Sequence, residues 1–385
     1  MATLTEKQAN LKEIGGRIRG SILGLFIGDA AGATLEFARG PISVEVARGA
    51  CRMGGGGMLR VGRGQITDDG ELAAALLRCL LDLSSPTPAP PSSTLLKAQI
   101  RRSSAAAYSR WFMSRPFDCG NTCANAFSVA VPPNSASLQS ESESESNGLA
   151  NAMEANAALM SKQSQANGGL MRIAPIALVS FIPVSLSESE ISEPDKTLQR
   201  QMLVAECAKA DARLSHSSVI TQDCNAAYAV AINHLFYNPS DVDGALAAAR
   251  AFISYGLVME WFTEATQNPR LYDFFNAKKN IGHVKHAFML AFYFLKLRTP
   301  FEDAIVQTLV LGGDTDTNAA IVGGMIGALH GIDAIPDFMS DSVLAFDCTN
   351  VSRGEGHQRP EEYSVSRVMN IVDEFISTKI NGLES

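Results

Sequence analysis

Apolar residues recur at helical spacing along almost the whole chain, and this feature restricts its fold most strongly. Runs in which β-branched residues alternate with polar ones are nearly absent, so few segments have the pattern of a half-buried strand. The spacing therefore predicts an all-α protein. The clearest predicted helices span residues 18–33, 71–83, 202–214, 224–236, 242–262, 284–297, 301–311, 318–330 and 365–380.

The length of the chain is sufficient for a large hydrophobic core. With 385 residues, of which 46% are hydrophobic, the sequence is unlike that of a disordered or fibrous protein. We expect a single compact helical domain over residues 1–385. Three polar stretches interrupt the helical pattern and predict loop insertions: a Pro- and Ser-rich stretch near 84–94, one near 132–149 with an alternating Ser and Glu run, and one near 185–196.

The charge of the chain excludes some classes of partner. Lys and Arg number 32 against 40 Asp and Glu, a net charge of −8, so no basic field is present to hold nucleic acid or an anionic membrane by charge alone. The first sixteen residues are polar and mixed in charge, unlike a secretory signal or an apolar anchor. We expect a soluble, cytoplasmic monomer whose seven Cys residues, which include no CxxC pair, are free thiols.

Near the N-terminus, glycines recur every four residues, at Gly20, Gly24, Gly28 and Gly32. Each glycine costs a helix about 1 kcal/mol relative to Ala. A helix with four of them on one face is therefore expected to have another segment close against that face. Asp29 interrupts the apolar run, which is also too short for a membrane-spanning helix. We predict a buried central helix here.

Two short acidic segments each open a helix rich in small residues: GQITDDGEL at 64–72 and GGDTDTNAA at 312–320. One interpretation is N-capping, since Asp and Thr accept the free amide hydrogens of a first turn. The other is a shared cation site, because carboxylates brought together repel one another without a cation. The candidate ligands are hard oxygens, which suit Mg²⁺ or Mn²⁺ rather than zinc or copper. They come from Thr67, Asp68, Asp69, Asp314, Asp316 and Thr317. The spacing alone leaves both interpretations open.

Six segments carry motifs that follow one another in a recognisable order. They are GSILGLFIGDAAGATLEF at 20–37, GQITDDGELA at 64–73, WFMSRPFDCGNTCANAF at 111–127, NGGLMRIAPIAL at 167–178, SHSSVITQDCNAAYAVAI at 215–232 and LGGDTDTNAAIVGGMIGALHG at 311–331. Together they resemble the ADP-ribosylglycohydrolases, a family that includes the dinitrogenase-reductase activating glycohydrolase and the ADP-ribosyl-acceptor hydrolases. The resemblance spans most of the chain.

This resemblance implies an all-α, orthogonally packed domain with two Mg²⁺ or Mn²⁺ ions at the base of a cleft. It implies that the six oxygen donors named above are the metal ligands. Glu36 matches a family glutamate beside the metals and the reacting ribose, and Asp118 matches a proposed catalytic carboxylate, so these two are the predicted catalytic residues. The predicted substrate-binding residues are Asn121 and Thr122, the backbone of Asn167, Gly168 and Gly169 as the diphosphate contact, and His216.

Some of these positions have simpler interpretations when the residues are taken alone. A plain turn explains Asn167 to Gly169, and a capping or core histidine explains His216. Arg172 either pairs with a carboxylate near the site or contacts the ligand. The four-glycine run at 54–57 is not followed by GK[ST], so it is not a P-loop, and we expect a flexible loop at the cleft edge.

The activity implied by the resemblance is hydrolysis of the bond between the anomeric carbon of ADP-ribose and an arginine or serine side chain. A metal-oriented water is the expected nucleophile, with Glu36 and Asp118 as the candidate acid and base. The expected partner is an ADP-ribosylated protein, visited transiently. Two alternatives stay open: a catalytically silent ADP-ribose-binding or structural family member, and a hydrolase of small ADP-ribose esters.

The sequence also departs from the family pattern in places that bear on substrate preference. TDDG at 67–70 stands where many members have TDDT. Cys123 and Ala124 follow Thr122 where a second Thr and an Arg are frequent. None of these departures removes a predicted metal carboxylate.

Overall fold

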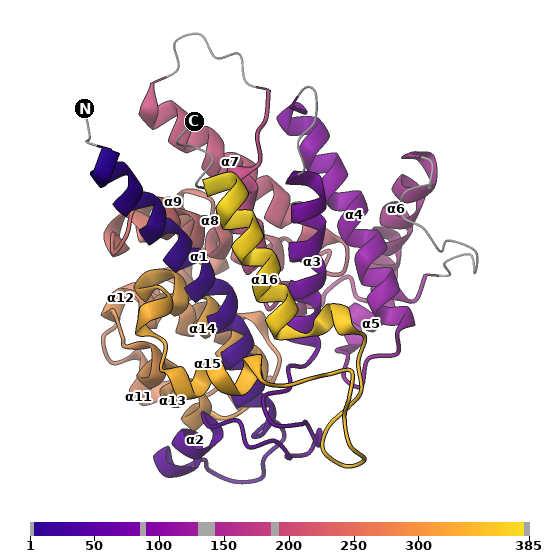
Figure 1. Cartoon of the computed structure of the whole chain (residues 1–385), viewed down its shortest axis with the longest axis vertical. Coiled ribbons are helices and arrows are strands. Elements are labelled where there is room, and N and C mark those ends of the chain that lie inside the picture. Colours follow the sequence, from indigo (N-terminus) through magenta and orange to yellow (C-terminus); the bar gives the residue numbers. More distant parts are fainter. Residues whose placement is uncertain (1–3, 85–89, 130–142, 186–191, 381–385) are drawn as a thin grey trace.

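The computed structural model (Figure 1) describes residues 4–84, 90–129, 143–185 and 192–380. These ranges form helices joined by loops and contain no β-sheet, so the prediction of an all-α fold is confirmed. The α-helices are α1 (Leu4–Ala33), α2 (Val44–Ala50), α3 (Asp68–Ser84), α4 (Ser93–Met113), α5 (Asn121–Phe127), α6 (Glu143–Met160), α7 (Glu193–Arg213), α8 (Val219–Tyr237), α9 (Val242–Ala251), α10 (Gly256–Gln267), α11 (Leu271–Phe274), α12 (Val284–Leu297), α13 (Phe301–Leu311), α14 (Thr315–His330), α15 (Asp337–Leu344) and α16 (Val365–Phe375).

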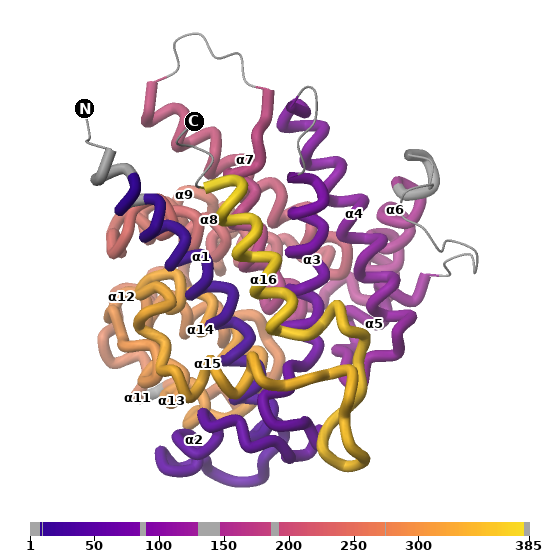
Figure 2. The backbone as a smooth tube through the Cα atoms, viewed as in Figure 1, coloured from indigo at the N-terminus to yellow at the C-terminus, as the bar shows by residue number. Residues whose placement is uncertain are grey.

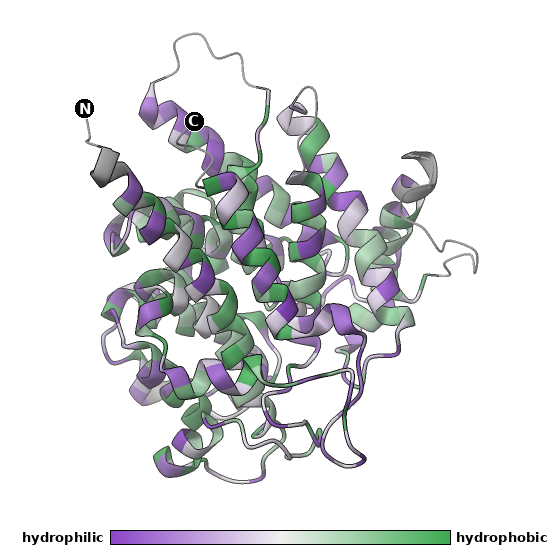
Figure 3. Ribbon diagram, viewed as in Figure 1, coloured by the Kyte–Doolittle hydropathy of each residue, from purple (hydrophilic) through white to green (hydrophobic). Residues whose placement is uncertain are grey.

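Helices α1 and α14 are the centre of the fold. On one side α3, α4 and α6 follow, each packed against its neighbour, and on the other side α12 and α13 pack against α14 (Figure 2). Apolar residues gather where helices meet (Figure 3), and most of the buried ones form one hydrophobic cluster. Within the described ranges, every helix is too short or too polar to span a bilayer.

The four glycines of α1 that recur every four residues, Gly20 to Gly32, face the backbone of α14. A Cβ at Gly24 would lie 2.4 Å from the carbonyl oxygen of Gly323, and one at Gly28 would lie 2.0 Å from that of Ala319. At the end of α1, a Cβ at Gly32 would lie 2.3 Å from Cα of Asp316. These pairs run in opposite directions along the two helices, which are therefore antiparallel. The predicted buried central helix is confirmed, and its partner is the helix that follows the second acidic segment.

The predicted helix over 242–262 is wrong, because it is two helices. Helix α9 ends at Ala251 and α10 begins at Gly256. Between them the N–H groups of Ser254 and Tyr255 each donate to Oδ2 of Asp223 in α8, at 2.7 Å. Asp223 thus takes backbone donors that a continuous helix would use internally. The apolar spacing does not reveal this break, since the acceptor lies on another helix.

The predicted loop insertions are shorter than expected where the structure describes them. Helix α6 begins at Glu143, inside the stretch expected to be a loop, while residues 130–142 lie outside the described ranges. The side chains of Ser92 and Ser192 accept hydrogen bonds from the first turns of α4 and α7. Serines that suggested loops are therefore helix caps.

Candidate active site

The two acidic segments of the sequence meet in the fold. Asp68 and Asp69 begin α3, and Asp316 and Thr317 lie in the first turn of α14. All four side chains are less than one-tenth exposed. Helices α3 and α14 contact each other, and the Thr317 side chain lies close enough to Asp69 to favour its charged form, so the two segments adjoin. The antiparallel packing of α1 and α14 brings Glu36, just after α1, to the same place.

The contacts of Asp314 test whether the second acidic segment is only an N-cap or part of a cation site. It occupies the N-cap position of α14, but its side chain accepts no hydrogen bond from the first turn. Instead its Oδ2 accepts a hydrogen bond from Nδ2 of Asn167 at 2.8 Å. Capping therefore does not explain this carboxylate.

Three carboxylates from distant segments converge at one point. Oxygen atoms of Glu36, Asp118 and Asp316 all lie within 4.8 Å of one another. Oε2 of Glu36 is buried and has no hydrogen-bond partner among the described residues. Burial, together with the nearby charges of Asp118 and Asp314, raises the pKa of Glu36 to about 8. Such crowding is unfavourable unless a proton or a cation is present.

The neighbouring carboxylates show the same effect. Burial and mutual repulsion raise the pKa of Asp68, Asp69 and Asp316 well above the ordinary range, and burial also raises the pKa of Asp118. Oδ1 of Asp69 is another buried oxygen without a partner in the described ranges. The buried ion pairs of those ranges use other carboxylates. A donor set of hard, unneutralised oxygens fits Mg²⁺ or Mn²⁺.

Asp29 of α1 holds the first acidic segment in place. Its fully buried carboxylate accepts hydrogen bonds from the N–H of Thr67 at 3.0 Å, the Thr67 hydroxyl at 3.0 Å and the N–H of Gly70 at 2.8 Å. Burial raises the pKa of Asp29 to about 7. Asp29 lies outside the two acidic motifs, and its signal in the sequence is a carboxylate inside the apolar run of a buried helix.

The loop before α5 carries Asp118 and is held by the C-terminal part of the chain. Arg359 donates hydrogen bonds to the carbonyl oxygen of Ser114 at 3.0 Å and to its hydroxyl at 2.8 Å. The ring of Phe117 stacks on that of His357, with 4.1 Å between centroids. Neither contact is visible from local sequence, because the partners are far apart along the chain.

Asn121 and Thr122 begin α5, next to this loop. Asn121 is exposed, and the Thr122 hydroxyl lies 2.8 Å from that of Ser164. The N–H of Gly120 donates to Oδ2 of Asp68 at 3.2 Å, which ties the start of α5 to the acidic cluster. The two predicted substrate residues therefore lie beside the predicted metal ligands.

The turn Asn167–Gly169 lies next to the cluster through the bond between Asn167 and Asp314. His216 is fully buried behind this turn, where a Cβ at Gly169 would lie 3.2 Å from Nδ1. Burial and the charge of Arg172 lower the pKa of His216 to about 3, so the ring is neutral. Of the two roles left open for Arg172, the structure shows pairing with a carboxylate, that of Asp211.

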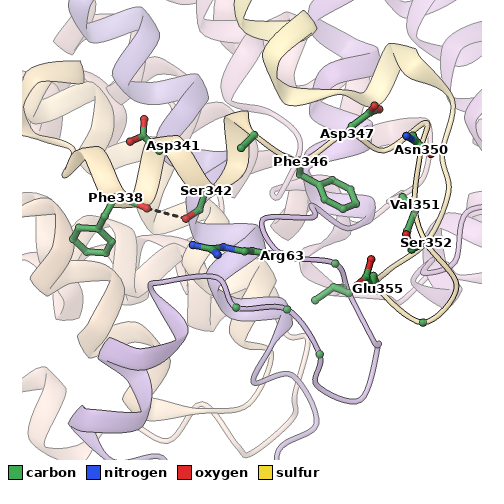
Figure 4. A pocket seen from close by; sticks show the side chains of 17 residues that line it. Arg63, Phe338, Asp341, Ser342, Phe346, Asp347, Asn350, Val351, Ser352 and Glu355 are labelled. Atoms are coloured by element: carbon green, nitrogen blue, oxygen red, sulfur yellow. Dashed lines mark hydrogen bonds between the residues drawn. The ribbon is translucent and has the colours of Figure 1, made fainter.

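A cavity of about 930 Å³ lies apart from these residues (Figure 4). Its lining includes Gly54 to Gly56, Arg63, Phe338, Phe346 and Glu355, and none of the predicted site residues. Three of the four glycines of the run thus line this cavity, while a Cβ at Gly57 would lie 2.7 Å from the carbonyl oxygen of Thr34, two residues before Glu36. The chemistry of the carboxylates, and not the size of a cavity, identifies the candidate active site.

Comparison with known proteins identifies the family of the chain. The family model of the ADP-ribosylglycohydrolases matches residues 10–355. The chain belongs to the ADP-ribosylglycohydrolase family. This confirms the resemblance carried by the six sequence segments.

Individual relatives of this family member are distant but align over most of their length. The chain is 26% identical over 322 residues to the ADP-ribosyl-dinitrogen reductase glycohydrolase of Rhodospirillum rubrum, which covers 83% of this chain and 87% of that protein. It is also 26% identical over 341 residues to an ADP-ribosylarginine hydrolase of Pseudomonas putida (strain GB-1). That alignment covers 87% of this chain and 74% of that protein. A solved structure of an ADP-ribosylglycohydrolase-related protein complex shares the fold, with a TM-score of 0.60 and 20% sequence identity. The match covers 94% of this chain and 99% of that one.

Proposed function

We propose that this ADP-ribosylglycohydrolase hydrolyses the bond between the anomeric carbon of ADP-ribose and a side chain of a modified protein. Arginine is the linkage we place first and serine the second, because the Pseudomonas relative is named for arginine. The observation that carries the proposal is the convergence of Glu36, Asp118 and Asp316 within 4.8 Å. A merely structural relative has no need of buried, crowded carboxylates, which cost stability.

The proposal includes two divalent cations, Mg²⁺ or Mn²⁺, at the acidic cluster. When bound, such cations act as Lewis acids and lower the pKa of water, which makes a nucleophile available at neutral pH. The buried oxygens without partners on Glu36 and Asp69 support this assignment. The residues that would hold the cations are Thr67, Asp68, Asp69, Asp314, Asp316 and Thr317.

Glu36 and Asp118 would move the protons of the reaction. Two carboxylates this close cannot both ionise freely, so their pKa values separate and one proton can be shared between them. One carboxylate then accepts a proton from the attacking water while the other donates to the leaving group. Asn121 and Thr122 would contact the ribose, and the Asn167–Gly169 turn the diphosphate.

The substrate class can be tested directly. Arginine-linked, serine-linked and ester-linked ADP-ribose are incubated with the protein, with and without Mg²⁺ or Mn²⁺, and free ADP-ribose is measured. We expect release from an amino-acid linkage only with the cation. Release from the ester alone would assign a different hydrolase activity. Binding of ADP-ribose without release from any substrate would favour a reader and overturn the proposal.

Removal of single ligands tests the cation site. Asp314→Ala and Asp316→Ala are expected to lower cation-dependent turnover by roughly 100-fold or more, because each removes part of a stabilisation worth several kcal/mol. Asp337→Ala is the matched control, since Asp337 is an exposed Asp in the first turn of α15. Its activity should stay unchanged. Full activity of either ligand variant in metal-free buffer would end the cation hypothesis.

A further inference from the structure

Arg172 lies at the centre of a buried polar network behind the Asn167–Gly169 turn. Its guanidinium is fully buried and pairs through Nε with Oδ2 of Asp211 at 3.0 Å. It also lies over the ring of Tyr108, 4.5 Å from the centroid. The Tyr108 hydroxyl donates to Oδ1 of Asp211 at 2.6 Å, so the ion pair is supported on two sides. These contacts fix the position of the guanidinium.

Two further hydrogen bonds of Arg172 point toward the predicted substrate residues. Its Nη1 donates to the carbonyl oxygen of Gly168 at 2.9 Å. This bond fixes the orientation of the peptide between Gly168 and Gly169. Two adjacent glycines are flexible and would not fix that orientation by themselves. Because the peptide is trans, the N–H of Gly169 points away from the guanidinium. The second bond runs from Nη2 to Oγ of Ser215, at 2.9 Å.

The bond to Ser215 favours one of the two nitrogens of His216 as the site of the ring proton. A guanidinium only donates hydrogen bonds, so Oγ of Ser215 is the acceptor and its own proton is free. Nδ1 of His216 lies 2.8 Å from this oxygen. The Sγ of Cys123 is the competing acceptor, and sulfur is a weak one. Ser215 therefore donates to Nδ1, and the neutral ring keeps its proton on Nε2.

Nε2 of His216 has no hydrogen-bond partner among the described residues, although it is buried. A Cβ at residue 168 would lie 3.0 Å from Sγ of Cys123 and 3.7 Å from Nε2, so Gly168 lies directly against the ring, with no side chain of its own beside the nitrogen. A buried N–H without an acceptor is costly and is rare in folded proteins. An anionic oxygen that reached Nε2 would satisfy it.

We propose that Arg172 is a positioning residue for an anionic group of the ligand. Through Ser215 it sets His216 in the Nε2–H tautomer, and through the Gly168 carbonyl it fixes the turn in front of that ring. Both effects favour a phosphate oxygen at the turn. The identity of the ligand as ADP-ribose rests on the proposed function, whereas the tautomer is a property of the protein alone.

The tautomer is tested first, on the full chain without ligand. Long-range ¹H–¹⁵N correlation spectra of histidine-labelled protein identify the protonated nitrogen, and the His216 signals are those lost in His216→Gln. We expect Nε2–H in the wild type and a mixture of tautomers in Ser215→Ala. Nδ1–H in the wild type would overturn the inference, whatever the activity of the protein.

Binding of ADP-ribose is tested next by calorimetry. Ser215→Ala is expected to weaken it roughly 5–20-fold, because one hydrogen bond to a charged group is lost from part of the population. Ser21→Ala is the matched control: Ser21 is fully buried and donates to the Gly324 carbonyl, away from the turn. Its binding and its His216 signals should match the wild type.

Kinetics then separate positioning from a merely structural role. Arg172→Lys cannot reach both Gly168 and Ser215, so we expect a higher KM with kcat within about two-fold of the wild type. Wild-type ADP-ribose affinity in Ser215→Ala would overturn the inference even if Arg172→Lys fails to fold. Failure of ADP-ribose to bind the wild type would instead overturn the proposed function and leave the tautomer result standing.

Discussion

Asp29 shows how one residue connects the central helix to the acidic cluster. Its carboxylate accepts hydrogen bonds from the N–H group and the hydroxyl of Thr67 and from the N–H group of Gly70. These donors are buried, and a buried donor left without an acceptor costs about 1–3 kcal/mol. The conformation of the segment that begins α3 therefore depends on this side chain.

Replacement of Asp29 by Ala should affect stability and cation binding together. We expect Asp29→Ala to lower the free energy of unfolding by about 2–5 kcal/mol and to weaken Mg²⁺ binding, since Asp68 and Asp69 lose their support. Urea unfolding and calorimetric titration measure the two effects. The matched control is Asp223→Ala, which removes a buried carboxylate that accepts the N–H groups of Ser254 and Tyr255. It should lose stability and keep the cation affinity; unchanged affinity in Asp29→Ala would contradict the positioning role.

The sequence predicts a site residue when the residues that act with it lie nearby in the chain. The carboxylates of the two acidic segments stand beside one another in short motifs, so their type and spacing suggest the chemistry. Two nitrogens of Arg359 donate hydrogen bonds to the carboxylate of Glu71, each at 2.8 Å. A third donates to the carbonyl oxygen of Ser114, in the loop that carries Asp118. Neither Arg359 nor Asp29 lies next to its partners in sequence, so only the folded chain reveals their roles.

At the scale of elements, the register of α1 against α14 places the candidate site. Four glycines of α1 lie against the backbone of α14 or of Gly331 just after it: Gly20, Gly24, Gly28 and Gly32. In the other direction, Gly323 and Gly327 of α14 lie against the backbone of α1. The sequence predicts that something approaches α1 closely, because the glycines recur every four residues. It does not predict which helix approaches or in which direction, since any helix with small residues would satisfy that pattern.

A methyl group in this interface should separate the two helices. Ala is usually better than Gly within a helix by about 1 kcal/mol. At Gly28, however, a Cβ would lie 2.0 Å from the carbonyl oxygen of Ala319, and backbone cannot move aside cheaply. We expect Gly28→Ala to lower stability by about 1–3 kcal/mol and to reduce activity by moving Glu36 away from Asp316. Thermal unfolding and ADP-ribose release measure the two effects.

Gly16 in the same helix provides the control. A Cβ there would meet its nearest neighbour, a methyl carbon of Ile332, at 3.9 Å. Gly16→Ala is therefore expected to be neutral or stabilising, with full activity. Equal behaviour of the Gly16 and Gly28 variants would contradict a role for close helix approach in placing the site.

At the scale of the whole molecule, stability and function oppose each other at the carboxylates. The chain has a net charge of −8, and several of its carboxylates are buried together instead of lying at the surface. Burial raises the pKa of Asp29 and Glu36 to about 7 and about 8. The folded protein therefore needs either protons or cations at the cluster.

This requirement predicts how stability changes with pH. The pKa of Asp29 rises from 3.8 in the unfolded chain to about 7 in the folded protein, and that of Glu36 rises from 4.5 to about 8. Between about pH 4 and pH 8 these two carboxyl groups bind more protons in the folded state than in the unfolded state, so their contribution to the free energy of unfolding falls as pH rises. Below this window both states are protonated and above it both are ionised. The metal-free protein is thus expected to have a lower Tm at about pH 8.5 than at about pH 5.

If the proposed cation site is correct, Mg²⁺ should reverse this loss, because it would bind the ionised carboxylates and compete with protons at low pH. At a concentration about 100-fold above its Kd, the cation adds about 2.7 kcal/mol. Scanning calorimetry with EDTA and with Mg²⁺ should therefore show a large rise in Tm at about pH 8.5 and a small one at about pH 5. Glu36→Gln cannot ionise at this position, so its metal-free Tm should fall less steeply with pH. A metal-free Tm that rises from about pH 5 to pH 8.5 would show that the buried carboxylates are neutralised by another means.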